Sequence, residues 1–319
     1  MASISVVVPT FNRASLISET LDAILRQTTS PDEIIVVDDG STDNTSAALL
    51  RYAGKLVVIR NSNSGELVSR NTGLRAAKGD LVAFCDSDDL WEQDFLLEMS
   101  ALWRSAPGLT AAYSNFRELQ DGHLAARTKF DDAPEGFWDS ARQVGLVSYV
   151  FDVPIAVRLL AFQPFFPSCM MVDRAAFQAL GGWDEAVSRV VGCDFATTLR
   201  VTNAPAIGAV QKPLVRIRKH ASNFSANVEA MNLGDARVLQ HVIQSRPELH
   251  GFASAFQASI VERRQQALDS AFSRRDFGAV RDIDRLIPGH MRSRRQRVKA
   301  GIALLPPSLA RMVAQAVSR

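Results

Sequence analysis

The stretch Leu81-Val82-Ala83-Phe84-Cys85-Asp86-Ser87-Asp88-Asp89 joins an apolar run to closely spaced carboxylates. The apolar run is typical of a buried strand, and the acids lie where that strand would end. Carboxylates held this close repel one another, so folding alone does not favour them. A divalent cation offsets the repulsion, because hard cations prefer carboxylate oxygens. The stretch therefore predicts a buried strand that carries a metal site at its carboxyl end.

Strand-like and helix-like segments alternate on both sides of this stretch, over residues 1–115. We expect strands over residues 4–8, 33–37, 56–60 and 81–84, and helices over residues 14–26, 41–52, 68–77 and 92–104. Strands separated by helices favour a mostly parallel, Rossmann-like α/β sheet with helices on both faces. Ligands of such sheets bind beyond the carboxyl ends of the strands, so Thr10, Asp38-Asp39 and Asp86–Asp89 are expected to converge.

The strand and helix pattern weakens after residue 115 and becomes wholly helical after residue 227. Asp121-Gly122 predicts a hairpin, and separate strands are expected over residues 206–210 and 214–217. The helical stretch includes residues 252–274 and 277–286. We therefore predict one α/β domain over residues 1–227 and a helical C-terminal region over residues 228–319.

Composition limits the class of protein. Of 319 residues, 47% are hydrophobic and 22% charged, which indicates a folded globular chain. A net charge of +2 gives no reason to expect a nucleic acid partner. Cys85, Cys169 and Cys193 lack zinc-site spacing and favour a reducing, cytoplasmic location without disulfides. The N-terminus does not resemble a signal peptide, and no apolar stretch is long enough to cross a bilayer.

Four ordered motifs resemble those of the family 2 glycosyltransferases. They are Ser5-Val6-Val7-Val8-Pro9-Thr10-Phe11-Asn12-Arg13, Val36-Val37-Asp38-Asp39-Gly40-Ser41-Thr42-Asp43, Ser69-Arg70-Asn71-Thr72-Gly73 and Phe84-Cys85-Asp86-Ser87-Asp88-Asp89. The resemblance covers about residues 3–225 and implies the GT-A fold, with a nucleotide-binding half (1–115) and an acceptor half (116–227). It implies inverting, hexosyltransferase-type transfer from a nucleotide-diphosphate sugar, with a UDP-sugar as the expected donor. The implied acceptor is a hydroxyl of a glycan or lipid-linked molecule in surface polysaccharide synthesis.

The resemblance also implies how the metal and the donor are bound. Asp86-Ser87-Asp88 is similar to the family's DxD motif, which implies that Asp88, Asp86 and His220 meet Mn²⁺ or Mg²⁺, with Asp89 near metal, ribose or sugar. The implied nucleotide-sugar contacts are Pro9, Thr10, Asn12, Arg13, Asp39, Arg70, Asp86 and Ser87. Other readings remain open. The acidic residues could instead stabilise a helix N-terminus, and Asp39 could simply form a turn. Arg70 could be a solvated surface residue, and His220 could have a structural role.

The acceptor side departs from the family pattern. The resemblance implies that Asp194 is the catalytic base, but relatives carry Glu-Asp where this chain has Cys193-Asp194. Asp194 could instead cap a helix, and Cys193 suggests a nucleotide-sugar-binding subunit that has lost catalysis. Trp183, Asp184 and Glu185 are the expected acceptor contacts, with Trp183 as a core residue in the alternative. A sugar-1-phosphate nucleotidyltransferase is disfavoured, because no glycine-rich basic loop follows the first strand.

Residues 290–319 are basic. They carry Arg292, Arg294, Arg295, Arg297, Lys299, Arg311 and Arg319 and no acid. Basic residues followed by amphipathic segments favour an anionic membrane surface, which would place the protein peripherally on the inner face of the cell membrane. A solvated or homo-oligomer-forming helix pair is the equal alternative, and RNA binding is disfavoured because few aromatic residues are interleaved.

Overall fold

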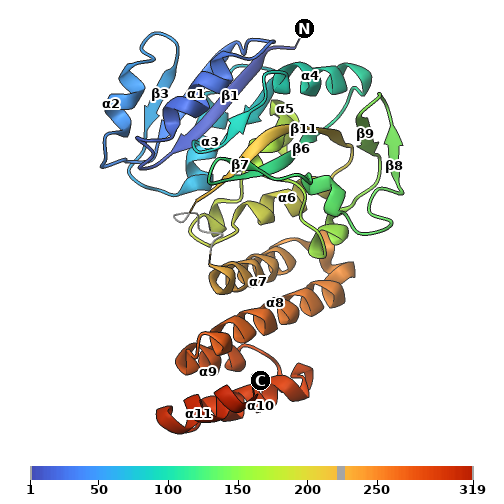
Figure 1. Cartoon of the computed structure of the whole chain (residues 1–319). Coiled ribbons are helices and arrows are strands. Elements are labelled where there is room, and N and C mark those ends of the chain that lie inside the picture. Colours follow the sequence, from blue (N-terminus) through green and yellow to red (C-terminus); the bar gives the residue numbers. More distant parts are fainter. Residues whose placement is uncertain (1, 221–226, 318–319) are drawn as a thin grey trace. The chain divides into compact units, whose positions relative to one another are not determined.

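The computed structural model describes residues 2–220 and 227–317, which form two compact units (Figure 1). The N-terminal unit contains Met1–Arg189 and Ala196–His220, and the C-terminal unit contains Val190–Phe195 and Ala221–Arg319. A short segment before Ala196 thus belongs with the C-terminal helices. The predicted division at residues 227 and 228 stays a prediction.

The N-terminal unit is built on one mixed β-sheet. Its strands are β1 (Ile4–Thr10), β2 (Glu33–Asp38), β3 (Val57–Arg60), β4 (Leu81–Phe84), β5 (Leu90–Trp91), β6 (Ala111–Gln120), β7 (His123–Leu124), β8 (Ala141–Gln143), β9 (Ser148–Phe151), β10 (Met170–Asp173) and β11 (Ile207–Lys219). The main path runs β3-β2-β1-β4-β10-β6-β11-β9-β8. Strands β3, β2, β1 and β4 are parallel, whereas β10 is antiparallel to both β4 and β6. The parallel half confirms the predicted α/β sheet.

Helices cover both faces of the parallel half. They are α1 (Ile17–Leu25), α2 (Thr45–Leu50), α3 (Glu66–Ala76) and α4 (Phe95–Ser105), followed in the chain by α5 (Arg174–Ala179) and α6 (Asp194–Thr202). Val6 and Val8 share a core with residues of α1 and α4. Val7 points to the opposite face, where it meets α3. A Cβ on Gly73 of α3 would lie 2.3 Å from Val7 Cγ1, so α3 can approach β1 this closely because residue 73 has no side chain.

Two sequence predictions for the acceptor half had different outcomes. The Asp121-Gly122 hairpin is confirmed, because β6 and β7 pair across it. The two strands predicted over residues 206–210 and 214–217 are wrong as separate elements. Irregular pairing with β6 around Pro213 lets β11 continue through that residue as one strand.

The C-terminal unit is helical, as predicted. Its helices are α7 (Val228–Ser245), α8 (Ala253–Ser273), α9 (Phe277–Arg285), α10 (Arg294–Ala303) and α11 (Pro307–Val317). Helices α10 and α11 contribute buried residues to its core, including Ile302, Ala303 and Ala310. The basic tail is therefore partly structural. Among the described residues, no helix combines the length and the apolar character that a membrane span requires.

Candidate active site

The acidic turn Asp86–Asp89 lies at the carboxyl end of β4, beside the ends of β1 and β2. Strands β2, β1 and β4 are parallel neighbours, and Thr10 is paired with Asp38 in the register. The carboxyl ends of parallel strands meet at one edge of a sheet. This topology places Thr10, Asp38-Asp39 and the acidic turn at the same edge, as the order of the segments predicts.

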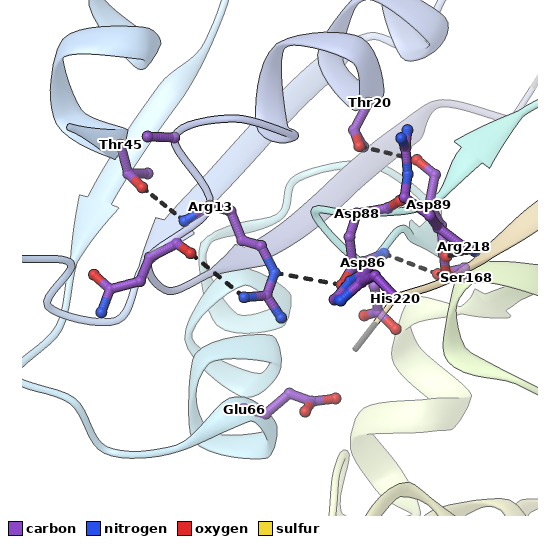
Figure 2. A network of polar contacts seen from close by, with 12 residues as sticks. Arg13, Thr20, Thr45, Glu66, Asp86, Asp88, Asp89, Ser168, Arg218 and His220 are labelled. Carbon is purple, nitrogen blue, oxygen red and sulfur yellow. Dashed lines mark hydrogen bonds and ion pairs between the residues drawn. The ribbon is translucent and has the colours of Figure 1, made fainter. Parts of the chain in front are cut away.

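Asp88 is where charged side chains from three segments meet (Figure 2). Its Oδ2 lies 3.1 Å from His220 Nε2 and 3.3 Å from Arg13 Nε. Its side chain is 16% exposed, so the carboxylate remains accessible to a small ligand. Residues brought together from the β1–α1 loop, the β4 turn and the end of β11 thus converge on one carboxylate oxygen.

Asp86 faces a buried arginine. Arg70 Nη2 lies 2.6 Å from Asp86 Oδ1, and the same nitrogen contacts Glu66 one turn earlier on α3. The pKa of Asp86 is raised to about 6, chiefly by burial and also by the nearby charges of Glu66 and Asp88, while Arg70 opposes the shift. The carboxyl therefore lies in surroundings where a further cation would be favourable.

Asp89 holds the turn together. Its Oδ1 accepts the backbone N–H of Arg218 at 2.9 Å, and its Oδ2 accepts the hydroxyl of Ser168 at 2.6 Å. Its own carbonyl accepts the hydroxyl of Thr20 at 2.9 Å. Burial raises the pKa of this carboxyl well above its usual range, helped by the neighbouring Asp88. We expected Asp89 near metal, ribose or sugar, but both of its oxygens bond to the protein scaffold.

Ser168 and Arg218 fix the acidic turn from outside it. The fully buried Ser168 accepts the backbone N–H of Asp86 at 2.9 Å while it donates to Asp89. Arg218 donates from Nε to the carbonyl of Asp88 at 2.8 Å and from Nη2 to Glu19 at 2.9 Å. Sequence reasoning missed Ser168, because only the insertion of β10 beside β4 brings it here.

The predicted base-binding residues line the ends of β1 and β2. Asp39 is buried, and its two oxygens accept the backbone N–H groups of Ser64 and Gly65, each at 2.8 Å. Pro9 and Thr10 are buried at the end of β1. Thr10 Oγ1 has no hydrogen-bond partner within the described part of the chain. A buried hydroxyl without a partner is uncommon, and a bound ligand would satisfy it.

Asn12 and Arg13 form the loop after β1. Asn12 has a left-handed backbone (φ 52°), and its side-chain oxygen accepts the N–H groups of Thr42 and Asp43 at 2.8 and 3.3 Å. It therefore braces the loop after β2. The backbone N–H of Arg13 donates to Thr45 at 2.9 Å, which directs its side chain to Asp88.

Arg70 and Trp183 form part of the core. Arg70 is fully buried and its guanidinium lies 4.8 Å from the centre of the Trp183 ring, which rules out the solvated alternative. Trp183 is 2% exposed and packs edge-on against Phe84 and Phe177. The expectation that Trp183 contacts the acceptor is therefore corrected in favour of its core alternative. The ring fills the space between β4 and α5 and has no face open to a sugar.

Asp184 and Glu185 follow this tryptophan. Asp184 is buried, and its backbone N–H donates to Thr197 at 2.9 Å. Glu185 is exposed and accepts from Asn71 at 2.7 Å. Ser87, between the metal-site candidates, is 6% exposed. The acceptor roles of Asp184 and Glu185, and the donor role of Ser87, stay predictions.

Asp194 is the first residue of α6 and is partly buried, next to the buried Cys193. Residues Val190–Phe195 belong with the C-terminal unit, whereas the rest of α6 belongs with the N-terminal unit. The helix start is compatible with the capping alternative as well as with the catalytic one. The base role of Asp194 stays a prediction.

Comparison with known proteins relates the first half of the chain to a glycosyltransferase family. The model of glycosyl transferase family 2 matches residues 5–152. This segment contains the acidic turn and three of its neighbours in space, Thr10, Arg13 and Arg70. Over this segment the chain is similar to glycosyltransferase family 2. His220, Ser168 and Arg218 lie outside the matched segment.

Curated family 2 relatives match part of the chain. The chain is 42% identical to the putative teichuronic acid biosynthesis glycosyltransferase TuaG of Bacillus subtilis over 159 residues, which are 47% of this chain and 62% of TuaG. The chain is 29% identical over 126 residues to WfgD of Escherichia coli, a UDP-Glc:alpha-D-GlcNAc-diphosphoundecaprenol beta-1,3-glucosyltransferase. These residues are 39% of this chain and 49% of WfgD. The chain thus spans about half to three-fifths of the lengths of these two relatives, and only 26% of the B. subtilis glycosyltransferase EpsJ.

Solved structures share the fold along nearly the whole chain. S. aureus TarS 1–349 in complex with UDP-GlcNAc has a TM-score of 0.56 at 20% identity and covers 98% of this chain and 92% of that one. The mannosyltransferase PcManGT of Pyrobaculum calidifontis, in complex with GDP-Man and Mn²⁺, has a TM-score of 0.57 at 20% identity. The match covers 99% of this chain and 86% of PcManGT. The predicted GT-A fold is confirmed.

Proposed function

We propose that this chain is an inverting, metal-dependent family 2 glycosyltransferase that uses a nucleotide-diphosphate sugar, with a UDP-sugar as donor. The observation that carries the proposal is the convergence of His220 and Arg13 on the Oδ2 atom of Asp88. This convergence lies at the strand edge that also holds Asp39 and the unsatisfied hydroxyl of Thr10. The Asp88 end of the site could thus bind a cation with a diphosphate, and the end formed by Asp39 and Thr10 could bind the nucleobase and ribose.

A divalent cation fits the donor set at Asp88. Carboxylate oxygen suits Mg²⁺ and Mn²⁺, and an imidazole nitrogen at 3.1 Å from it favours Mn²⁺. Over residues 2–220 and 227–317 no group of three or more His, Cys, Asp and Glu side chains could hold a metal. Asp88 and His220 would therefore be the main protein ligands, and Asp86 a further one. Substrate oxygens and water would fill the remaining coordination positions, as is usual when phosphates complete the site. The bound ion would neutralise the leaving diphosphate.

The protein residues divide the remaining work. Arg13 can bind the diphosphate, because its guanidinium already lies beside the carboxylate of the proposed metal ligand Asp88. Asp39, held by two backbone amides, presents a fixed carboxylate to an N–H of the base. In the transfer, Asp194 takes the proton of the acceptor hydroxyl, the oxygen bonds to the anomeric carbon from the opposite face, and the sugar–phosphate bond breaks with its electron pair on the diphosphate.

The acceptor is proposed from the relatives and the basic tail. TuaG is named for teichuronic acid biosynthesis, and WfgD for a diphosphoundecaprenol-linked acceptor. We infer that this chain adds a hexose to a glycan or lipid-linked acceptor in surface polysaccharide synthesis. Exposed Arg294, Arg295 and Arg297 would hold it on the inner, anionic face of the membrane. Sedimentation with phosphatidylglycerol vesicles that falls as salt rises is the expected result, and sedimentation-equilibrium analysis tests the homo-oligomer alternative.

The competing proposal is a nucleotide-sugar-binding subunit without catalysis. Cys193, where the family resemblance implies an acid beside the base, is the feature that favours it. It is buried and so cannot replace a carboxylate in contact with solvent or substrate. This subunit would bind UDP with Mn²⁺ and never release sugar.

A donor panel separates the two proposals. UDP-, GDP- and dTDP-sugars are incubated with the full chain and Mn²⁺, and free nucleotide diphosphate is measured, because slow hydrolysis needs no known acceptor. The transferase proposal expects hydrolysis of at least one donor that stops with EDTA. Tight, Mn²⁺-dependent UDP binding with no hydrolysis of any donor would support the inactive subunit.

A further inference from the structure

A groove of about 650 Å³ lies entirely within the C-terminal unit, between the end of α8 and the start of α10. It is lined by Asp269, Phe272 and Ser273 from α8 and by Arg294, Arg295, Val298 and Lys299 from α10. Its volume is in the range of small-molecule sites. On α8 the lining residues follow helical spacing, so one helix face forms one wall.

The groove carries uncompensated positive charge. Lys299 is 8% exposed, and its Nζ lies 2.6 Å from Asp269 Oδ1, so these two charges neutralise each other. Arg294 and Arg295 are exposed, and within the described residues neither forms an ion pair. Two guanidinium groups, each able to donate a fork of N–H groups, therefore lack an anion.

The same groove also offers apolar surface. Phe272 is 5% exposed and lies under the Lys299 ammonium, which is 5.2 Å from the centre of its ring. Val298 is 47% exposed on the opposite wall. The first turn of α10 is already capped by Ser293 and Gln296, so the backbone amides there are not the source of the positive potential. A ligand that fits combines an anionic head with an apolar chain.

We propose that this groove binds the phosphate group of a lipid, with Arg294 and Arg295 on the phosphate and the exposed Val298 against the first part of the chain. Arginine forks match phosphate oxygens, and an open groove lets the rest of the chain leave toward a bilayer. The groove differs from a diffuse basic surface because only part of the exposed arginines belongs to it. Arg297 on α10 and Arg311 on α11 are exposed but do not line it.

The test compares two charge-matched double variants of the full chain. Binding of dihexanoyl phosphatidic acid, which is monomeric in water, is measured by calorimetry, with dihexanoyl phosphatidylcholine as a probe with the same chains but no net charge and inorganic phosphate as a probe of the anion alone. Geranyl phosphate replaces phosphatidic acid in a further arm, so that a glycerolipid source and an isoprenoid source of the phosphate are distinguished. We expect Arg294→Gln/Arg295→Gln to weaken lipid phosphate binding by at least about tenfold, and Arg297→Gln/Arg311→Gln to leave it within about twofold.

Circular dichroism melting of both variants confirms that each is folded. Equal weakening of lipid phosphate binding by the two variants would indicate diffuse electrostatic attraction and overturn the proposed site. Inorganic phosphate that binds as tightly as the lipid would also overturn it. Binding of polyuridylate but not of the lipid phosphates would also overturn it. The groove lies outside the donor site, so loss of donor hydrolysis cannot be confused with loss of this binding.

Discussion

Individual residues show what sequence motifs describe well and what they omit. The motif around Asp88 placed a carboxylate at a ligand-binding edge, because acids directly after a buried strand have few structural uses. It did not separate Asp88, which faces His220 and Arg13, from Asp89, which bonds to Ser168 and Arg218. The difference depends on partners far along the chain, in β10 and β11, and no local pattern encodes it.

Ser168→Ala tests the support of the acidic turn. The change removes the acceptor of the Asp86 N–H and the donor to Asp89, both buried, and should destabilise the fold by about 1–3 kcal/mol. It should also weaken Mn²⁺-dependent UDP binding, because the turn loses its fixed geometry. Urea unfolding and calorimetry measure the two effects, with Ser105→Ala, at an exposed hydroxyl on α4, as the control. Unchanged UDP binding would leave Ser168 with a purely structural role.

Asp194→Asn tests the proposed base. An amide cannot take a proton, so donor turnover should fall by about 10²–10⁴-fold while UDP affinity stays close to that of the parent. Turnover is followed as donor hydrolysis, in which water takes the place of the acceptor hydroxyl. A variant with parental turnover would assign Asp194 to capping α6, and one that loses UDP binding would place it at the donor.

At the scale of elements, the alternating pattern predicted the parallel half of the sheet well. Polar residues follow short apolar runs there, and α1 and α4 each carry one apolar face. The acceptor half was predicted less well, because β10 enters the sheet antiparallel between β4 and β6, and β11 crosses Pro213 without a break. Register and strand order depend on contacts between distant segments, which periodicity does not report. The burial of Trp183 follows from the same non-local packing.

Gly73→Ala tests the contact of α3 with β1. The new methyl group would lie 2.3 Å from Val7 Cγ1, so the helix that carries Arg70 must shift, at a cost of about 1–3 kcal/mol. Gly301→Ala in α10 is the matched control, since its methyl group would meet no atom within 4 Å and should stabilise by about 0.5–1 kcal/mol. Thermal melting compares them. Two variants of equal stability would mean that α3 adapts freely.

The pKa of Asp86 predicts a pH dependence of the metal-free protein. Because this carboxyl takes up its proton at about pH 6 when folded and near its ordinary value of 3.8 when unfolded, the folded state binds the extra proton between these limits. Its contribution to stability therefore falls as pH rises through that window, by about 1–3 kcal/mol. Melting of the parent and of Asp86→Asn from about pH 4.5 to 7.5 isolates this group. A constant difference between them would contradict the shift.

At the scale of the whole molecule, solved structures confirm the GT-A fold, while the chemistry depends on how the carboxyl edge of the parallel strands is used. The basic tail shows the limit of composition as a guide. Its charge pattern suggested a surface segment, yet α10 and α11 complete the core of the C-terminal unit. Deleting residues 290–319 would expose that core, so point substitutions are the better way to ask what the tail binds.

The central claim is that Asp88 holds a cation that binds the donor diphosphate. Titration of UDP into the metal-free chain, with Mn²⁺ and with EDTA, tests it directly in the parent, in Asp88→Asn and in the control Asp121→Asn, which makes the same change at an exposed turn. We predict Mn²⁺-dependent UDP binding in the parent and the control, weakened by at least about tenfold in Asp88→Asn. UDP affinity that is indifferent both to Mn²⁺ and to Asp88→Asn would contradict it.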